Sequence, residues 1–426
     1  MILAIDVGST YLKCAVFEGE QMLEKKSRPM PGRLPAGEDA RFEVDAAAIV
    51  ELAQEMIDDA LTRFPGAEAI YLDSQMHGYV LTDPAGGAPS PYVSWQDRLA
   101  EPELSKIALR IGPEAIRRMG TRFKAGLCAC SFFARHKGAP LGEDRLLHTL
   151  GGYLLYRLSG GTAHVCHESM AASLGLYDCE AHDWNRETQR RIGAERLTLP
   201  RVIPHTEAAG AYRGIPLYGD IGDHQASVYG LGEDTANSII LTLGTAGILC
   251  MPSNRPGRPE MEVRPYFHGQ SLLTKTRQPG GRTLDLLVRF VGECAALVTG
   301  GPVEAQAVWE ALQAGPPLDA AGLHITPEYF SGGGAGEIAG IGAHNLTPQS
   351  LLAAGLDALA EAYGAAVREF LEIEPKVSRL LLCGGRLTKW AYLQQALARR
   401  TGLSVVCPAR QDEALHGLAR LARERC

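Results

Sequence analysis

Apolar and polar positions alternate along the chain in blocks that predict strands followed by helices. Residues 2–17 are apolar on both sides of the polar turn Gly8-Ser9-Thr10, which predicts a β-hairpin. The same pattern returns at 236–243 and 246–251, so the sequence predicts a second hairpin with a similar turn. This repetition indicates an internal duplication with a boundary near 232–236.

The rest of the pattern completes an α/β alternation. Residues 45–64 carry apolar side chains at helical spacing, and Asp45 is placed to cap the first turn. The runs 69–73 and Arg379–Cys383 predict buried strands, and the second of these ends at two glycines. Further predicted elements are a strand at 79–82, mainly helical structure at 101–160, amphipathic helices at 284–300 and 347–373, a helix at 388–401 and a strand at 403–407. Strands that alternate with helices predict an α/β protein. The glycine-rich stretch 331–342 is the clearest candidate for a mobile loop.

Chain length and charge limit the possible classes of protein. A chain of 426 residues is long enough for two domains, or for one large domain divided by a cleft. We expect the domains at 1–233 and 234–426. The net charge of −7 argues against nonspecific binding to nucleic acid, which requires a basic surface.

The cysteines and the N-terminal residues indicate a cytoplasmic protein. The ten cysteines are scattered, form no C-x-x-C pair and mostly lie in apolar runs, as reduced and buried thiols do. The first residues lack a basic leader, and Asp6 interrupts their apolar run, so we expect no signal peptide. We also expect no membrane span, because the sequence shows no continuous apolar stretch of the required length.

Asp223 is the strongest candidate for a catalytic residue. It follows a turn of small residues and precedes a run with helical character, a position where loops carry chemistry. A carboxylate there can orient a sugar hydroxyl and accept its proton. The alternative is that Asp223 only caps the helix that starts near His224. Asp220 is the nearby competitor, and we prefer Asp223 because its turn runs directly into the helix.

The two hairpin turns can bind phosphate. Gly8, Ser9 and Thr10 offer backbone N–H groups and hydroxyls to phosphate oxygens, and Thr245 occupies a similar turn. Asp6 precedes the first turn and can hold Mg²⁺ through water. Neither turn has the Walker sequence, so a P-loop fold is not expected. Taken alone, each turn is also explained as an ordinary polar hairpin turn.

A third group of residues suits a sugar. Gln75, Met76 and His77 follow a strand, where His77 can meet hydroxyls while Met76 packs against carbon. Trp95 and Asp97 add a flat apolar face and a carboxylate. Elsewhere, two glycines after a buried strand (Gly384 and Gly385) allow the close approach of a flat ligand. A polar surface turn at His77 and a tight turn at the two glycines are the plain alternatives.

In order and spacing these segments resemble the FGGY carbohydrate kinases along nearly the whole chain. The segments that carry the resemblance are Asp6-Val-Gly-Ser-Thr10, Gln75-Met-His-Gly78, Ser94-Trp-Gln-Asp-Arg98, Gly222-Asp223-His-Gln-Ala-Ser-Val-Tyr229, Leu243-Gly-Thr-Ala-Gly247 and Leu382-Cys-Gly-Gly385. Each motif is short, but six in the right order are specific. Within the family the sequence is most similar to the sedoheptulokinase and xylulokinase branch.

The resemblance implies an actin-like, RNase H-related fold of two α/β domains, with ATP, Mg²⁺ and sugar in the interdomain cleft. It implies an N-terminal FGGY domain at 1–233 with the sugar site, and a C-terminal FGGY domain at 234–426 with the adenosine site. The implied catalytic residue is Asp223, and the implied metal ligand is Asp6. The implied substrate-binding residues are Gln75, Met76, His77, Trp95, Asp97 and His224, and the implied cofactor-binding residues are Gly8, Ser9, Thr10, Lys13, Gly244, Thr245, Gly384 and Gly385.

The implied activity is ATP-dependent phosphorylation of a ketose such as sedoheptulose or xylulose. We expect a small-molecule sugar as the partner, no nucleic acid and no membrane, with a homodimer as a possible assembly. Three alternatives stay open: a kinase for another sugar or polyol, a non-kinase ATPase of the actin or chaperone type, and a sugar-binding protein without activity. Release of ADP that depends on sugar separates the kinases from the other two.

Overall fold

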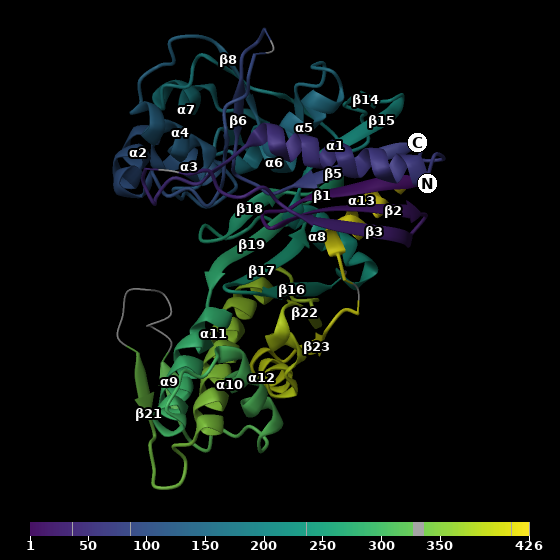
Figure 1. Ribbon diagram of the computed structural model, residues 1–426. Helices are drawn as coiled ribbons and strands as arrows, with labels where there is room; N and C mark the ends of the chain where they lie inside the picture. Colours follow the sequence, from purple (N-terminus) through teal and green to yellow (C-terminus); the bar gives the residue numbers. More distant parts are fainter. Residues whose placement is uncertain (36, 86, 236, 327–335, 410, 426) are drawn as a thin grey trace. The chain divides into compact units, whose positions relative to one another are not determined.

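The computed structural model describes residues 1–35, 37–85, 87–235, 237–326, 336–409 and 411–425 (Figure 1). The chain forms two compact units. The first consists of Met1–Gly232, Glu262–Leu272 and Arg410–Cys426, and the second of Glu233–Met261 and Leu273–Ala409. The chain therefore leaves the first unit near residue 232 and returns to it twice. A single division of the chain after residue 233 would assign both returning segments to the other domain.

The first unit is built on a six-stranded sheet of order β14-β15-β5-β1-β2-β3. These strands are β1 (Ile2–Val7), β2 (Tyr11–Glu18), β3 (Gln21–Pro29), β5 (Ala69–Ser74), β14 (Gly210–Tyr212) and β15 (Ile215–Gly222). β1 and β2 pair in antiparallel fashion, which confirms the predicted hairpin. β5 runs parallel to both β1 and β15, so these three strands end at the same edge of the sheet. Functional side chains of α/β proteins lie at this edge.

Helices cover both faces of this sheet. α1 (Ala46–Arg63) and α5 (Leu150–Leu158) share one apolar core with β1, β2, β5 and β15. α1 begins as predicted, with the Asp45 side chain accepting hydrogen bonds from the backbone of its first turn. α13 (Glu413–Leu421) contacts β1, β5 and α8 (Asp223–Gly230).

α8 and α13 cross at backbone distance. A Cβ atom added to Gly230 would lie 1.8 Å from the carbonyl oxygen of Glu413, and one added to Gly417 would lie 2.0 Å from that of Ala226. Only glycine fits at either position, because real Cβ atoms do not approach other atoms so closely. The helix that begins at Asp223 is therefore fixed against a segment that is distant in sequence.

The first unit also has a second apolar core, to which residues between Met76 and Leu199 contribute, and further short elements. The helices are α2 (Leu104–Ile111), α3 (Pro113–Arg118), α4 (Cys128–His136), α6 (Glu168–Ser173) and α7 (Arg186–Arg191). The short strands are β4 (Glu43–Val44), β6 (Val80–Thr82), β7 (Tyr92–Val93), β8 (Arg145–His148), β9 (Val165–His167), β10 (Tyr177–Asp178), β11 (Asp183–Trp184), β12 (Leu197–Thr198), β13 (Arg201–Ile203) and β18 (Glu262–Pro265). The region 101–160, predicted to be mainly helical, contains α2, α3, α4 and α5, separated by loops and by β8, which pairs with β6 and β12.

The second unit repeats the strand order of the first, with β19-β17-β16-β22-β23 in place of β3-β2-β1-β5-β15. Its strands are β16 (Ser238–Leu243), β17 (Gly247–Ser253), β19 (Ser271–Gln278), β20 (His324–Thr326), β21 (Glu337–Ala339), β22 (Arg379–Gly384) and β23 (Ser404–Val406). Its helices are α9 (Gly281–Thr299), α10 (Ala305–Ala314), α11 (Pro348–Ile373) and α12 (Ala391–Thr401). The second predicted hairpin is confirmed, and the repeated strand order supports the predicted duplication.

α11 is long and apolar enough to cross a membrane by composition, which the sequence analysis did not anticipate, but 78% of its most apolar stretch is buried inside the protein. We therefore interpret it as a core helix. Of the predicted mobile loop 331–342, residues 331–335 lie outside the described residues, and β21 occupies 337–339.

Candidate active site

Three carboxylates lie near the ends of the parallel strands of the first unit. Asp6 on β1 and Asp73 on β5 are register partners on neighbouring strands, so their side chains leave the same face of the sheet. Asp223 follows the end of β15. Burial raises the pKa of Asp73, and the negative charges of Asp6 and Asp223 raise it further, so the three groups interact electrostatically.

Asp73 is a residue that the sequence analysis missed. Its side chain is fully buried, and neither carboxylate oxygen receives a hydrogen bond from the described residues. Burial raises its pKa well above the ordinary value, and the charge of Asp6 raises it further. The sequence does carry a signal for Asp73: it is a carboxyl at the penultimate position of an apolar strand. Burying a charge without a partner costs free energy, so such a residue indicates a functional site.

Asp220 and Asp223 differ in accessibility. Asp220 is fully buried and accepts hydrogen bonds from Ser74 Oγ at 2.9 Å and from Thr149 Oγ1. Asp223 is half-buried, and its Oδ1 accepts one hydrogen bond from the backbone N–H of His224 at 2.8 Å. Asp223 is the first residue of α8 and follows the cap residue Gly222, so its charge stabilises the helix start while the residue stays partly exposed. The geometry thus favours Asp223 as the group that can meet a ligand.

The pKa of Asp223 lies near neutrality. Burial raises it from 3.8 to about 7, and the charge of Asp6 acts in the same direction. A carboxylate with this pKa can accept a proton from a hydroxyl near pH 7.

The first phosphate turn exposes its two hydroxyl residues. Ser9 and Thr10 are exposed, and the Gly8 N–H closes the turn on the carbonyl oxygen of Tyr11 at 3.2 Å. Lys13 Nζ lies 3.1 Å from Asp6 Oδ2. Lys13, which we expect to bind the nucleotide, therefore lies beside Asp6, the predicted metal ligand.

Gln75 joins the predicted sugar segment to this turn. Its Nε2 donates to the carbonyl oxygen of Gly8 at 3.1 Å, while its buried Oε1 has no donor among the described residues. Gln75, Ser9 and Thr10 line one cavity of about 310 Å³ within the first unit. Met76 is buried and belongs to the second apolar core.

The hydrogen bonds of His77 determine which of its ring nitrogens carries the proton. His77 Nδ1 lies 2.8 Å from the carbonyl oxygen of Ser173, which can only accept, so this nitrogen carries the proton. Burial lowers the pKa of His77 well below its ordinary value, and the positive charge of Lys124 lowers it further. The ring is therefore neutral, and its Nε2 is a hydrogen-bond acceptor. His77 has a φ of 76°, which is rare for a side-chain-bearing residue and is held here by hydrogen bonds to Ser173.

His224 carries its proton on the other ring nitrogen. Its Nδ1 lies 3.0 Å from Nη1 of Arg264, and because a guanidinium can only donate, Nδ1 must accept. Burial and the charge of Arg264 lower the pKa of His224 to about 3, so the neutral ring carries its proton on Nε2. That Nε2 is buried and has no partner among the described residues.

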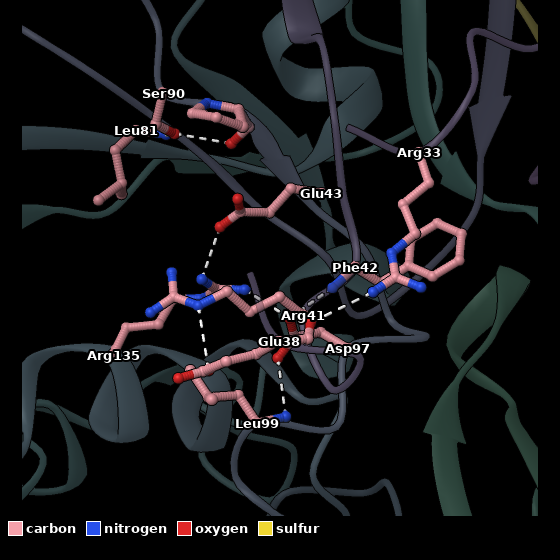
Figure 2. Close-up of polar contacts among 11 residues, drawn as sticks. Arg33, Glu38, Arg41, Phe42, Glu43, Leu81, Ser90, Asp97, Leu99 and Arg135 are labelled. Atoms are coloured by element: carbon pink, nitrogen blue, oxygen red, sulfur yellow. Dashed lines mark hydrogen bonds and ion pairs between the residues drawn. The ribbon is translucent and has the colours of Figure 1, made fainter. Parts of the chain in front are cut away.

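Asp97 is engaged by the protein itself. Its Oδ2 accepts from the Phe42 N–H at 2.9 Å and pairs with Arg135 at 2.5 Å, and its Oδ1 accepts from the Leu99 N–H at 3.2 Å (Figure 2). The side chain is buried and its acceptor positions are largely used, which favours a structural role over the predicted contact with sugar. Trp95 is 41% exposed and remains able to meet a ligand.

The second phosphate turn and the glycine pair lie together within the second unit. Leu243 and Gly384 are register partners on β16 and β22, and the Gly385 N–H donates to the carbonyl oxygen of Leu243 at 3.1 Å. Gly384 has a φ of 112°, which favours glycine. The adjacent residues Gly244 and Thr245 receive hydrogen bonds from the first residues of α9, at 2.8 and 3.3 Å.

Comparison with known proteins identifies the family of this chain. Residues 1–240 match the FGGY family of carbohydrate kinases, N-terminal domain. A glycerol kinase from Rhodospirillum rubrum is 27% identical over 467 residues, which cover 99% of this chain and 89% of that protein. An uncharacterized sugar kinase from Archaeoglobus fulgidus is 27% identical over 276 residues, 58% of this chain and 55% of that protein. The chain thus spans about half the length of several curated relatives that it matches.

The solved structures show the fold. A xylulose kinase from Rhodospirillum rubrum aligns with a TM-score of 0.83 at 18% identity, over 99% of this chain and 89% of that one. The predicted two-domain α/β fold of the actin-like class is thereby confirmed. The match to the N-terminal domain spans more than half of the chain and includes all three converging carboxylates, so the chain belongs to the FGGY family of carbohydrate kinases.

Proposed function

We propose that this protein is a kinase that transfers the terminal phosphoryl group of ATP to a hydroxyl of a ketose with five to seven carbons. The observation that carries the proposal is Asp223, a half-buried carboxylate whose pKa is raised to about 7 beside Asp6. Sedoheptulose and xylulose are the first candidate acceptors. Membership of the family supports the reaction class.

Asp223 would orient the attacking hydroxyl and accept its proton as the new bond to phosphorus forms. His77 Nε2 would accept a hydrogen bond from a second hydroxyl, because its other nitrogen is used by Ser173. Several directional contacts of this kind hold a polyol in one orientation, which lowers the entropic part of the barrier. Trp95 would add a flat apolar face beside them.

Each of the two units offers residues that suit a nucleotide. The N–H groups and hydroxyls of Ser9 and Thr10 suit phosphate oxygens, and Lys13 supplies a positive charge near them. Thr245 offers a similar turn, and Gly384 with Gly385 leaves room for the flat adenosine.

Asp6 fits a role as the metal ligand. Its carboxylate is nearly buried and lies at the end of β1, next to the exposed phosphate turn. In the part of the chain that the structure describes, no three His, Cys, Asp or Glu side chains are placed to hold a cation together. Mg²⁺ suits such a site because it takes one or two carboxylates and completes its shell with water and phosphate. When bound, Mg²⁺ would neutralise charge on the phosphates during transfer.

A screen of acceptors tests the proposal. ADP release is measured by a coupled assay with MgATP and, in turn, xylulose, sedoheptulose, other ketoses, pentitols and glycerol. We expect a ketose to give the highest kcat/KM. Robust turnover of glycerol without any ketose would refute the substrate class and favour the activity named for the Rhodospirillum rubrum relative. ADP release that is independent of every acceptor would favour an ATPase.

A matched pair of variants assigns the activity to this site. Asp223→Asn and Asp220→Asn each convert one carboxylate to an amide, three residues apart at the end of β15. We expect the first to lose activity on the best acceptor and the second to keep it, because Asp220 is enclosed by Ser74 and Thr149. Equal effects would refute Asp223 as the base.

A further inference from the structure

Arg264 occupies an unusual position in the first unit. It lies on β18, its side chain is 7% exposed, and it contacts His224 through one arm of its guanidinium. The other nitrogens are bound by Glu262, whose Oε2 accepts from Nε at 3.0 Å and from Nη2 at 2.7 Å. A buried arginine is stable only when its charge is paired, and Glu262 supplies the pairing.

This arrangement leaves the guanidinium little freedom. Two hydrogen bonds to Glu262 Oε2 hold its plane, and Thr121 Oγ1 donates to the same carboxylate oxygen at 3.2 Å. The planar guanidinium holds its five N–H donors in a fixed fork, so fixing Nε and Nη2 also fixes the direction in which Nη1 donates. Nη1 lies 3.0 Å from His224 Nδ1.

The consequence for His224 follows from donor and acceptor chemistry. A guanidinium has no lone pair to offer, so Nδ1 must be the unprotonated nitrogen and Nε2 must carry the hydrogen. The resulting Nε2–H is buried without a partner among the described residues, and an unmade hydrogen bond of this kind is costly. His224 directly follows Asp223, and its backbone N–H donates to Asp223 Oδ1 at 2.8 Å. A ligand oxygen at Asp223 is the natural partner for the orphaned donor.

We propose that Arg264, held by Glu262, is a positioning residue that fixes His224 as an Nε2–H donor to an oxygen of the acceptor substrate. The acceptor substrate then contacts two imidazoles with opposite hydrogen-bonding roles. His77 Nε2 accepts a hydrogen bond from one hydroxyl, and His224 Nε2–H donates a hydrogen bond to another oxygen. The identity of the ligand rests on the proposed function, whereas the state of the ring does not.

Nitrogen NMR of the full chain, labelled with ¹⁵N-histidine, tests the first part. The two ring nitrogens have well-separated shifts according to which one carries the proton. His224 is assigned by the signals that disappear in His224→Gln. We expect a protonated Nε2 and a bare Nδ1 in the unaltered protein, loss of this single state in Arg264→Met, and its retention in Arg264→Lys.

Arg135→Met is the matched control. Arg135 is also buried in the first unit, with a side chain that is 9% exposed, and it also pairs with carboxylates, those of Glu43 and Asp97. The Arg135→Met substitution should leave the His224 signals unchanged. If Arg264→Met does not fold, Glu262→Gln keeps the arginine but weakens its anchor, and should produce a mixture of the two ring states. A His224 ring with its proton on Nδ1, or unchanged signals in a folded Arg264 variant, would overturn the proposal.

Kinetics with the best acceptor from the screen tests the second part. Arg264→Met and His224→Ala should each raise the acceptor KM roughly tenfold, the cost of one buried hydrogen bond, and leave the KM for ATP unchanged. The double variant should be no worse than His224→Ala alone, because Arg264 acts through His224. Additive effects would overturn the positioning role. If no acceptor is turned over, the proposed function fails while the NMR result still decides the state of the ring.

Discussion

Replacing Asp220 by asparagine should change how the stability of the first unit depends on pH. Asp220 is fully buried, and burial raises its pKa from 3.8 to about 7, although hydrogen bonds from Thr149 and Ser74 oppose the rise. A pKa that is higher in the folded state means that folding favours the protonated form. The contribution of Asp220 to stability is therefore most favourable below pH 3.8, falls as the pH rises towards 7, and is constant above that.

The size of the effect follows from the shift. The difference between about 7 and 3.8 is 3.2 units, and at about 1.4 kcal/mol per unit the ionised carboxylate costs on the order of 4 kcal/mol. Asparagine keeps the shape and stays neutral at every pH. The stability of Asp220→Asn relative to the unaltered protein should therefore increase by about 3 kcal/mol as the pH is raised from 5 to 8, because this range covers about two units of the shift.

Hydrogen exchange during a urea titration measures this gain. Peptides from β5 report only the unit that contains Asp220, so the second unit does not enter the result. Asp59→Asn serves as the control, because hydrogen bonds from Lys26 and Arg63 lower the pKa of this exposed carboxylate. Its substitution should cost stability at neutral pH rather than add it. A stability difference between Asp220→Asn and the unaltered protein that does not vary with pH would refute the reasoning.

Three further predictions concern activity on the best acceptor. Asp223→Asn should lower kcat by roughly 10²–10⁴-fold, and a near-normal kcat in this variant would contradict the role of Asp223 as the base. In the unaltered protein, kcat/KM should fall below about pH 7, because Asp223 takes up a proton there. Asp6→Ala should cripple turnover and raise the Mg²⁺ concentration needed for half-maximal rate, whereas an unchanged Mg²⁺ titration would exclude Asp6 as a ligand. His77→Ala should raise the acceptor KM and leave the KM for ATP nearly unchanged, and equal changes in both would indicate a structural residue instead.

Local patterns predicted most of the fold. The hairpin at β1 and β2 and the capped helix α1 were predictable because each depends on neighbours in the sequence: an apolar run, a polar turn, a carboxylate at a helix start. The strand β8 within the mainly helical region was not predicted, because its partners β6 and β12 are far away in the sequence. The two returns of the chain to the first unit were missed for the same reason.

The candidate site shows the same limit. Asp223 and Asp6 stand beside recognisable turns, and the sequence alone identified both. Arg264 lies 40 positions from His224, and no local pattern links them. Asp97 was identified by its place in a motif, but the motif does not reveal that Arg135 and two backbone N–H groups already occupy its carboxylate.

The close crossing of α8 and α13 has a consequence for how the protein is made. The ribosome synthesises α8 long before α13, and the entire second unit is translated in between. The helix that begins at Asp223 therefore lacks its packing partner until residues 413–421 have emerged. A nascent chain released before that point would hold an incomplete first unit, with Ala226 and Gly230 of α8 uncovered. We therefore expect only chains translated through α13 to complete the first unit, and shortened products to be captured by chaperones or proteases.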